Sequence, residues 1–449
     1  MERNNLKVFE EALTRLEAGF DNLPAFDDSV DLDALRPVLM QVAERLHDNF
    51  PYHHPLYAGQ MLKPPHPVAR LAYWLAMFIN PNNHALDGGR ASSAMEKEAV
   101  AEIAAMFGYP QHLGHLASSG TIANLEALWI ASQERDGVIL ASEQAHYTHS
   151  RISAVLRLPF ESISVDKHAR MDMDALETRL RTGDVSCVVA TLGTTAAGAV
   201  DPLHEIIPLA RKYGARVHVD SAYGGYFTLT SNLGENARQA FDAVPHADSI
   251  VVDPHKHGLQ PYGCGCVLFA DPAVGRHYKH DSPYTYFSSD ELHLGEISLE
   301  CSRAGAAAVA LWATQKLLPL EKNGEFARGL EAGRSAALEW RERLDAEGWR
   351  VAMPPELDIL LFADSKFDSG SITRSSNAIF KRAAELDLHL AVARFPKALL
   401  ASWWPDLAWR DAEVAVLRSC LMKPHHAEWL PAIHERLQKA RDYLDRPDK

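Results

Sequence analysis

The chain has 449 residues, 47% hydrophobic and 23% charged, which is typical of a soluble globular protein with two or three structural units. Its net charge of −14 argues against nucleic acid or an anionic membrane surface as a partner, and no apolar run approaches the roughly 18 residues that span a bilayer. The start of the chain lacks the apolar core of a signal peptide, and five cysteines, an odd number, do not form a disulfide framework, so a reducing cytoplasm fits best.

Residues 1–60 are predicted to form an N-terminal arm. The stretch 6–20 carries its apolar side chains on roughly one face of a helix. Prolines at positions 51, 55, 64, 65 and 67 then interrupt the helical pattern. Because the arm is too apolar to be left in water and too short to fold alone, it favours a partner subunit and hence a homodimer. After the arm, Ser93 and Glu96 form a capping-box pattern, which predicts a helix from Ser93 through Phe107 that stops at Gly108.

From about residue 115, β-rich runs alternate with helical patterns. We expect strands at 138–141, 185–191, 216–220, 249–253 and 266–269, and helices at 123–133, 173–181 and 203–213. Strands rich in Val and Ile between amphipathic helices predict an α/β fold with a buried, mostly parallel sheet, which we assign to a large domain over residues 61–310. A helix-rich stretch at 304–344, strand-like runs at 359–362 and 388–393, and a closing helix predict a smaller α+β domain over residues 311–449.

Two polar residues stand at the ends of predicted strands. Asp220 closes the run 216–220, and Lys256 follows the run 249–253. Ligands of parallel sheets bind beyond the carboxyl ends of the strands, so both residues would meet there. A lysine next to His255 and before Gly258 suits Schiff-base chemistry, which needs a neutral amine and therefore a site that disfavours the ammonium ion. Since a neighbouring acid can keep a pyridine nitrogen protonated, the pair predicts pyridoxal 5'-phosphate (PLP) as the cofactor.

Three further positions agree with a PLP site, although each has a plainer interpretation. Ser119, Gly120 and Thr121 precede a helix and could cradle a phosphate or simply cap that helix. His146 follows the run 138–141 and could stack on a planar ring or satisfy a local hydrogen bond. Thr194 follows the run 185–191 and could contact the ring or be an ordinary strand residue.

The other histidines and cysteines do not predict a metal site. Cys264 and Cys266 lack the usual Cys-x2-Cys spacing, and no partner pair stands at the spacing of a zinc site. We interpret these cysteines, together with His218 and the pair His425-His426, as structural.

In combination, the motifs resemble those of the group II PLP-dependent amino-acid decarboxylases, which have the aspartate-aminotransferase superfold (fold type I). The resemblance covers residues 50–310 well and the tail loosely. At position 119, serine replaces the more usual glycine. The resemblance implies a homodimer in which the arm lies across the partner subunit. In chain order, the motifs are Ser118-Ser119-Gly120-Thr121, Glu143-Gln144-Ala145-His146, Thr191 to Thr195, His218-Val219-Asp220-Ser221-Ala222-Tyr223-Gly224-Gly225 and Asp253-Pro254-His255-Lys256.

The resemblance also implies a role for each matching residue. Lys256 would bind the PLP aldehyde, and Asp220 would bind the pyridine nitrogen. His146 and Ala222 would cover opposite faces of the ring, and Thr194 would lie near its oxygen substituent. The phosphate would be bound by Ser119, Gly120, Thr121 and His255. Either Tyr284 or Tyr286, in the stretch 280–289, would return a proton to the substrate carbon after CO2 leaves.

The predicted reaction is the decarboxylation of an L-amino acid to its amine and CO2. An aromatic substrate is mildly favoured by Tyr57, Tyr284, Tyr286 and Phe287, although aromatic residues in a loop can equally pack a lid. An acidic or diamino acid stays open as the substrate, as does a different fold-type-I PLP lyase that acts on a C–C bond. The complete set of Lys256, Asp220 and His146 disfavours a non-catalytic PLP-binding protein.

Overall fold

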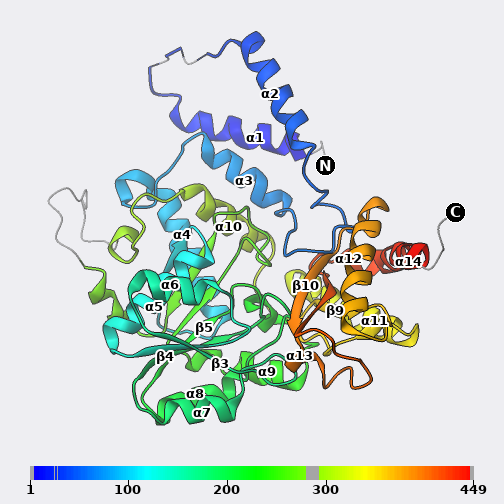
Figure 1. Ribbon diagram of the computed structural model, residues 1–449. Coiled ribbons are helices and arrows are strands. Elements are labelled where there is room, and N and C mark those ends of the chain that lie inside the picture. Colours follow the sequence, from blue (N-terminus) through cyan, green and yellow to red (C-terminus); the bar gives the residue numbers. More distant parts are fainter. Residues whose placement is uncertain (1–4, 25, 28, 280–292, 445–449) are drawn as a thin grey trace.

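The computed structural model describes residues 5–24, 26–27, 29–279 and 293–444 (Figure 1). Its centre is a seven-stranded sheet with the strand order β1-β7-β6-β5-β4-β2-β3. Strand β7 runs antiparallel to both of its neighbours, and every other pair is parallel. The strands are β1 (Leu113–Ala117), β2 (Val138–Ser142), β3 (Phe160–Ile163), β4 (Val185–Thr191), β5 (Arg216–Asp220), β6 (Ser249–Val252) and β7 (Gly265–Phe269).

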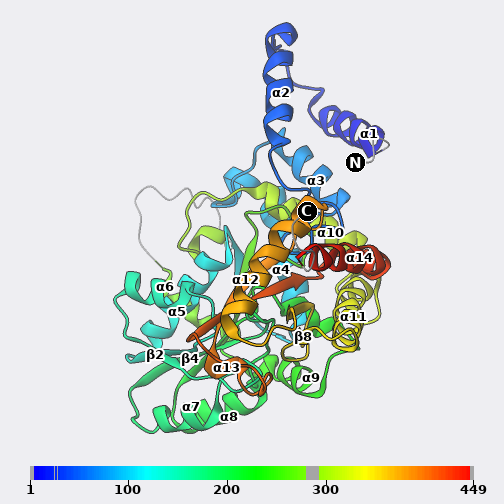
Figure 2. The ribbon, with the colours of Figure 1, turned by 45° about the vertical axis from the view of Figure 1, so that its right-hand side comes forward.

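Helices cover both faces of this sheet, as an α/β fold requires. Figures 1 and 2 show α5 and α6 on one side of the sheet and α7 and α8 on the other. Every residue of β2, β4, β6 and β7 is buried, which explains their richness in Val and Ile. The helices of this part are α5 (Gly120–Glu134), α6 (Thr148–Leu156), α7 (Met173–Leu180), α8 (Leu203–Lys212) and α9 (Glu235–Asp242).

The predicted fold class is confirmed, and most of its elements lie where the sequence placed them. The five expected strands are β2, β4, β5, β6 and β7, and the three expected helices are α5, α7 and α8. Strands β1 and β3, at the two edges of the sheet, were not expected.

The expected start of the helix after the arm is wrong. Helix α4 spans Leu86–Met106, so Ser93 lies inside it and does not cap it. Glu96 has a different role from the capping one that its spacing from Ser93 suggested. Its carboxylate accepts hydrogen bonds from Asn83 Nδ2 (2.6 Å), the backbone N–H of Leu116 (3.0 Å) and Arg303 Nη1 (2.8 Å). The end of the helix agrees with the expectation, since Gly108 follows it with a φ of +76°.

A second, four-stranded antiparallel sheet has the order β10-β11-β9-β8. The expected run 359–362 lies in β9, and the run 388–393 overlaps β10. Strand β11, which pairs with both, was not expected. The strands are β8 (Arg350–Val351), β9 (Ile359–Ala363), β10 (Ala391–Pro396) and β11 (Glu413–Cys420), and the helices of this part are α11 (Glu325–Ala346), α12 (Ser369–Glu385), α13 (Lys397–Leu400) and α14 (His426–Leu444).

The N-terminal arm contains α1 (Asn5–Glu17), the short 3-10 helix η1 (Ala18–Phe20) and α2 (Leu32–Leu46). The first two elements match the expected helix, whereas α2 was not expected. Phe9 of α1 stacks on Trp74 of α3 (Pro67–Met77) at 4.0 Å between ring centroids, and α3 packs on α10 (Gly305–Leu317). Helix α2 has no buried residue and stands away from the body of the molecule (Figures 1 and 2).

The remaining helical elements are short 3-10 turns, namely η2 (Gly225–Leu229), η3 (Val244–His246), η4 (Pro272–His277) and η5 (Leu294–Glu296). Over the part of the chain that the structure describes, no helix combines the length and the apolar character needed to cross a membrane.

Candidate active site

A cavity of about 180 Å³ lies at the carboxyl ends of the parallel strands. The segments that follow β1, β2, β4, β5 and β6 all contribute to its wall. The structure therefore brings together residues that are more than 130 positions apart in the sequence, from Ser119 to Lys256. The residues that line the cavity are Ser119, Gly120, Thr121, Asn124, His146, Thr148, Thr191, Gly193, Thr195, Asp220, Ala222, Tyr223, Asp253, His255 and Lys256.

Lys256 lies between two carboxylates. Its Nζ is 3.0 Å from Asp253 Oδ2, one turn earlier in the chain. Burial lowers the pKa of Lys256, but the attraction of Asp253 and then of Asp220 outweighs burial, and the pKa is raised above its usual value. The expectation that the site disfavours the ammonium ion is therefore wrong for the chain alone. Asp253 and Asp220 favour the charged form of the Lys256 amine as long as no other group is bound to that amine.

Asp220 ends β5 and is buried. Its Oδ2 accepts a hydrogen bond from His149 Nε2 at 2.8 Å, and its Oδ1 accepts one from the backbone N–H of Ala222 at 3.1 Å. Burial alone would raise the pKa of this carboxyl. The hydrogen bond and charge of His149, followed by Lys256 and the Ala222 amide, outweigh burial and hold the pKa well below its usual range. Asp220 is therefore an anion at neutral pH.

His149 is a site residue that the sequence reasoning missed. It belongs to α6, is buried, and has no hydrogen-bond partner for Nδ1 among the described residues. Its signal was its spacing, because His146 and His149 are three positions apart at the start of a helix and so point toward one side.

His146 and Ala222 both line the cavity, as expected, from the loops after β2 and β5. The imidazole of His146 accepts a hydrogen bond at Nδ1 from the backbone N–H of Thr148 at 3.3 Å. Burial lowers the pKa of His146, against the attraction of Asp220, so the ring is neutral at pH 7. A neutral, half-buried imidazole is suited to stacking on a planar ring.

The expected phosphate-binding residues also gather at the cavity. Ser119 is the N-cap of α5, where its Oγ accepts from the N–H of Ile122 at 3.3 Å, so it caps the helix and lines the cavity at once. A Cβ on Gly120 would lie 2.7 Å from both carboxylate oxygens of Asp253, so this position requires glycine. His255 lines the same wall and is held by a hydrogen bond of 2.8 Å between its Nδ1 and the carbonyl of Cys264.

Of the residues expected to bind the cofactor, only Thr194 is absent from the described cavity wall, and Tyr57, expected near the substrate, does not line it either. The Oγ1 of Thr194 accepts a hydrogen bond from the backbone N–H of Ala199 at 3.0 Å, within the turn that follows β4. Thr191, Gly193 and Thr195 line the cavity in its place. The hydroxyl of Thr191 is buried and has no partner among the described residues, which makes it the better candidate for a contact with a ligand.

A second missed residue, Arg418 of β11, joins the small sheet to this site. Its guanidinium donates to the carbonyls of Thr195 (2.6 Å), Ala196 (3.0 Å) and Gly59 (3.2 Å). Because Thr195 lines the cavity, Arg418 is a cation held near the cavity by a strand of the small sheet. Its signal in the sequence was weak, since it is a single arginine in an otherwise apolar strand.

Two other expectations concern the loop tyrosines and metals. Tyr284 and Tyr286 lie outside the described residues. His218 bonds to Asn124 Oδ1 through Nε2 (2.8 Å) and to Ser249 Oγ through Nδ1 (2.9 Å), which is a structural role. Within the described ranges, no group of three or more His, Cys, Asp or Glu side chains could hold a metal ion.

The residues present fit PLP. The cavity offers an amine for the aldehyde, an anion for the ring nitrogen, and hydroxyl groups with a helix N-terminus for the phosphate. Two buried oxygen atoms in its wall, Thr191 Oγ1 and Asp253 Oδ1, have no partner within the described chain. A polar ligand in the cavity would supply partners for such atoms.

Comparison with known proteins agrees with this chemistry. Residues 51–322 match the family described as the pyridoxal-dependent decarboxylase conserved domain. The L-tyrosine decarboxylase of Enterococcus faecium is 29% identical over 70% of this chain and 68% of its own length, and the L-2,4-diaminobutyrate decarboxylase of Acinetobacter baumannii is 29% identical over 71% and 68%. The crystal structure of Oryza sativa TDC with PLP and tryptamine is 16% identical, covers 99% of both chains and gives a TM-score of 0.79, which shows a common fold.

Proposed function

The chain belongs to the pyridoxal-dependent decarboxylase family, and on that premise we propose that it removes the α-carboxylate of an aromatic L-amino acid. The observation that carries the proposal is the convergence of Lys256, Asp220 and His146 on one cavity. The family resemblance predicted from the sequence is thereby confirmed, and PLP is the cofactor.

Each residue has a task that follows from its chemistry. When bound, PLP draws electrons from the substrate α-carbon into its protonated ring, which allows the bond to the carboxylate to break. Asp220 holds the proton at the ring nitrogen, because His149 and the Ala222 amide keep its carboxylate anionic in a buried place. Lys256 holds the cofactor through its amine. His146 and Ala222 would pack against the ring, Ser119, Gly120, Thr121 and His255 would bind the phosphate, and the hydroxyl of Thr191 would be free to contact the cofactor.

Arg418 is our candidate for positioning the cavity wall. Its guanidinium donates to the carbonyls of Thr195, Ala196 and Gly59, and Thr195 lines the cavity, so Arg418 holds this part of the wall in one position.

The charges at the cavity support an aromatic substrate. Of the described residues that line it, Lys256 is the only lysine or arginine, and Asp220 and Asp253 are acids. A substrate with a second carboxylate would find no free cation there. Tyr262, whose ring centroid lies 4.8 Å from that of His255, is an aromatic side chain beside a residue of the cavity wall. One relative is named as a tyrosine decarboxylase and another as a diaminobutyrate decarboxylase, so aromatic and diamino acids are the two substrate classes to be compared.

CO2 release from a panel of amino acids tests the substrate. The panel contains tyrosine, tryptophan, phenylalanine, glutamate, aspartate, ornithine and 2,4-diaminobutyrate. We expect kcat/KM to be highest for an aromatic member. A higher value for diaminobutyrate, ornithine or an acidic amino acid would replace the aromatic proposal, while CO2 release from none would contradict decarboxylation itself.

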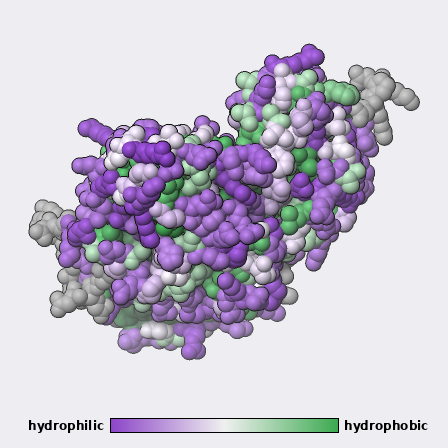
Figure 3. All heavy atoms as spheres, turned by 90° about the horizontal axis from the view of Figure 1, so that it is seen from below, coloured by the Kyte–Doolittle hydropathy of each residue, from purple (hydrophilic) through white to green (hydrophobic). Residues whose placement is uncertain are grey.

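We further propose that the protein is a homodimer in which α2 is covered by a second copy of the chain. Apolar side chains on α2 that are more than a third exposed would then be removed from water. Figure 3 shows the molecule from below, and this face is mostly hydrophilic. The exposed apolar residues of α2 are Leu32, Leu35, Val38, Leu39, Met40, Val42 and Leu46.

Two coarser proposals complete the description. We divide the chain into an arm (residues 1–60), a PLP-binding domain (61–310) and a small domain (311–449), supported by the separate sheets at 113–269 and 350–420.

We place the protein in the cytoplasm, supported by five cysteines that are all unpaired, of which four are buried.

A further inference from the structure

A second and larger cavity, of about 530 Å³, lies where three distant parts of the chain meet. These parts are residues 63–67 after the arm, the first turn of α11, and residues 423–425 between β11 and α14. The walls of the two cavities include neighbouring residues of the chain, because His257 lines this cavity and Lys256, the preceding residue, lines the PLP cavity. None of these residues has a task in the decarboxylation reaction described above.

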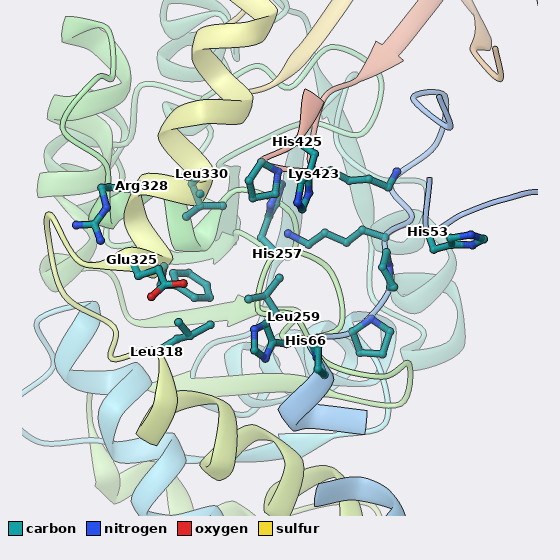
Figure 4. Close-up of a pocket in the computed structure, with 17 residues that line it drawn as sticks. His53, His66, His257, Leu259, Leu318, Glu325, Arg328, Leu330, Lys423 and His425 are labelled. Atoms are coloured by element: carbon teal, nitrogen blue, oxygen red, sulfur yellow. The ribbon is translucent and has the colours of Figure 1, made fainter. Parts of the chain in front are cut away.

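Cations dominate the wall of this cavity. Lys63, Lys423 and Arg328 line it, and Glu325 is the single carboxylate among the described residues that do so. Figure 4 shows Lys423, His425 and His257 gathered on one side. Helix α11 begins at the cavity, and its N-cap, Gly324, has no side chain to satisfy the first amide groups, which adds positive potential there.

The two lysines are only partly satisfied. Lys423 is 4% exposed, and its Nζ donates to the carbonyls of Tyr57 (2.6 Å) and Leu62 (3.3 Å). Lys63 Nζ donates to the carbonyl of Met422 at 3.3 Å. An ammonium group has three donors, so hydrogen bonds between described residues leave two donors of Lys63 unused and one of Lys423, whose Nζ also lies 5.3 Å from the centre of the Tyr57 ring. Burial lowers the pKa of Lys63 to about 8. Burial, together with the charge of Lys63, lowers the pKa of Lys423 to about 7.

His257 gives an independent sign of a missing ligand. It is 1% exposed, and neither its Nδ1 nor its Nε2 has a hydrogen-bond partner among the described residues. Its Nε2 lies 3.3 Å from Asp358 Oδ2, and the opposite oxygen of Asp358 accepts from the hydroxyl of Tyr223 at 2.6 Å. Buried polar atoms in folded proteins almost always have partners. An unpaired imidazole nitrogen on the wall of a cationic cavity therefore points to an absent polar group.

The other side of the cavity is apolar. Leu259, Leu318 and Phe326 lie there, and Figure 4 shows Leu259 and Leu318 across the cavity from Lys423. A volume of about 530 Å³ is within the range of roughly 300–1,000 Å³ that small-molecule sites occupy. The site would suit a molecule with an anionic end and an apolar body.

We propose that this cavity binds a small organic oxyanion, whose phosphate or carboxylate group contacts Lys63, Lys423 and His257 and whose apolar body packs on Leu259, Leu318 and Phe326. The ligand would supply negative charge to a wall on which Glu325 is the single carboxylate among the described residues. Because the cation count favours a dianion, a phosphate ester should bind more tightly than a carboxylic acid of the same shape.

Isothermal titration calorimetry of the PLP-loaded enzyme tests the proposal, with phenyl phosphate, phenylacetate, inorganic phosphate and phenol as probes. PLP occupies the phosphate site of the active centre, and the variants described next, in the wall of the second cavity, distinguish binding there from binding of an aromatic acid at the substrate site. We expect phenyl phosphate to bind most tightly, phenylacetate next, and phosphate or phenol alone at least about tenfold more weakly than phenyl phosphate. Phenol binding as tightly as phenyl phosphate would contradict an anion site, and so would the absence of any binding heat.

Variants with opposite expected effects locate the binding. Lys63→Met removes a cation and should weaken phenyl phosphate about tenfold. Glu325→Gln removes the carboxylate and should strengthen binding, an effect that misfolding cannot imitate. Lys316→Met, at an exposed lysine paired with Glu102 at 2.8 Å, is the matched control and should leave the affinity unchanged. Equal affinities in all three variants would place the probe elsewhere and overturn the proposal.

Discussion

Changing His149 to leucine removes the one described side chain that donates a hydrogen bond to Asp220, across 2.8 Å. Both residues are buried, so water cannot replace the lost donor without a rearrangement. The Asp220 carboxylate would keep only the Ala222 amide and the attraction of Lys256. The pKa of Asp220 should therefore rise, because burial, which favours the protonated form, would meet less opposition.

The expected size of the effect follows from the type of bond. A hydrogen bond to a charged group is worth about 1.5–3 kcal/mol, which corresponds to a loss of roughly ten- to a hundredfold in kcat if the bond matters mainly while charge builds on the ring. The acid limb of the pH profile should also move. Asp220 must be an anion to hold the ring proton, so a raised pKa makes activity fail at a higher pH than in the unmodified enzyme.

CO2 release, measured between pH 4.5 and 8 with saturating PLP, gives both quantities. His149→Asn keeps a donor and should recover part of kcat, whereas a pure packing role would make it no better than leucine. His115→Leu is the matched control, because His115 forms a buried pair with Glu126 at 2.9 Å away from the cavity. It should lower the melting temperature and leave the pH profile unchanged. Unchanged kcat and an unmoved acid limb in His149→Leu would refute the reasoning.

Four further predictions concern the proposed roles. Lys256→Ala should abolish turnover and leave a folded protein, and an adduct with PLP that borohydride still fixes would contradict its role. Asp220→Ala should reduce kcat far more than PLP affinity, since the ring proton matters most in the transition state, and a near-normal kcat at saturating PLP would count against it. Deleting residues 1–50 should give monomers or aggregates by light scattering, and a soluble, active monomer would disprove the arm's place in the dimer. Changing Tyr284 or Tyr286 to phenylalanine should suppress amine formation in one of the two variants, and normal yield in both would remove these tyrosines from the mechanism.

Much of the active site could be predicted because its residues follow strands. Asp220 and Lys256 each come directly after a buried, Val- and Ile-rich run, and the ends of parallel strands meet at one edge of a sheet. The local sequence therefore sets the position of these side chains. His146, Ala222 and the residues at the start of α5 (Ser119, Gly120 and Thr121) were predictable for the same reason, and all of them line the cavity.

Thr194 shows where this reasoning fails. The alternation of side chains along β4 ends at Thr191, and the turn that follows passes through Gly193 with a φ of +101°. This backbone rotates Thr194 toward the amide of Ala199 and leaves Thr191 and Thr195 at the cavity. Which threonine faces the ligand thus depends on a conformation available mainly to glycine, which the residue types alone do not determine.

Ser93 and Glu96 show a second limit. Their spacing matches a capping box, yet the Glu96 carboxylate bonds to Asn83, Leu116 and Arg303, which come from other elements. The same spacing fits both a capping box and a buried glutamate that bonds to other elements, and only the contacts between distant segments show which of the two is present. Helix α2 was also missed. None of its residues is buried within one chain, so it does not pack on the core of that chain.

The cationic cavity has no counterpart in any local pattern. Lys63 and Lys423 are 360 positions apart, and each has an ordinary neighbourhood in the sequence. They approach because β11 ends beside the segment that leads into α3, where each lysine bonds to a carbonyl group of the opposite segment. Placing two cations in a half-closed space costs free energy, visible in their lowered pKa values, and an unfilled cavity does not recover that cost. A bound oxyanion would offset this free-energy cost. The proposed binding site can therefore be recognised only from tertiary contacts, whereas the catalytic residues can be predicted from their places after successive strands.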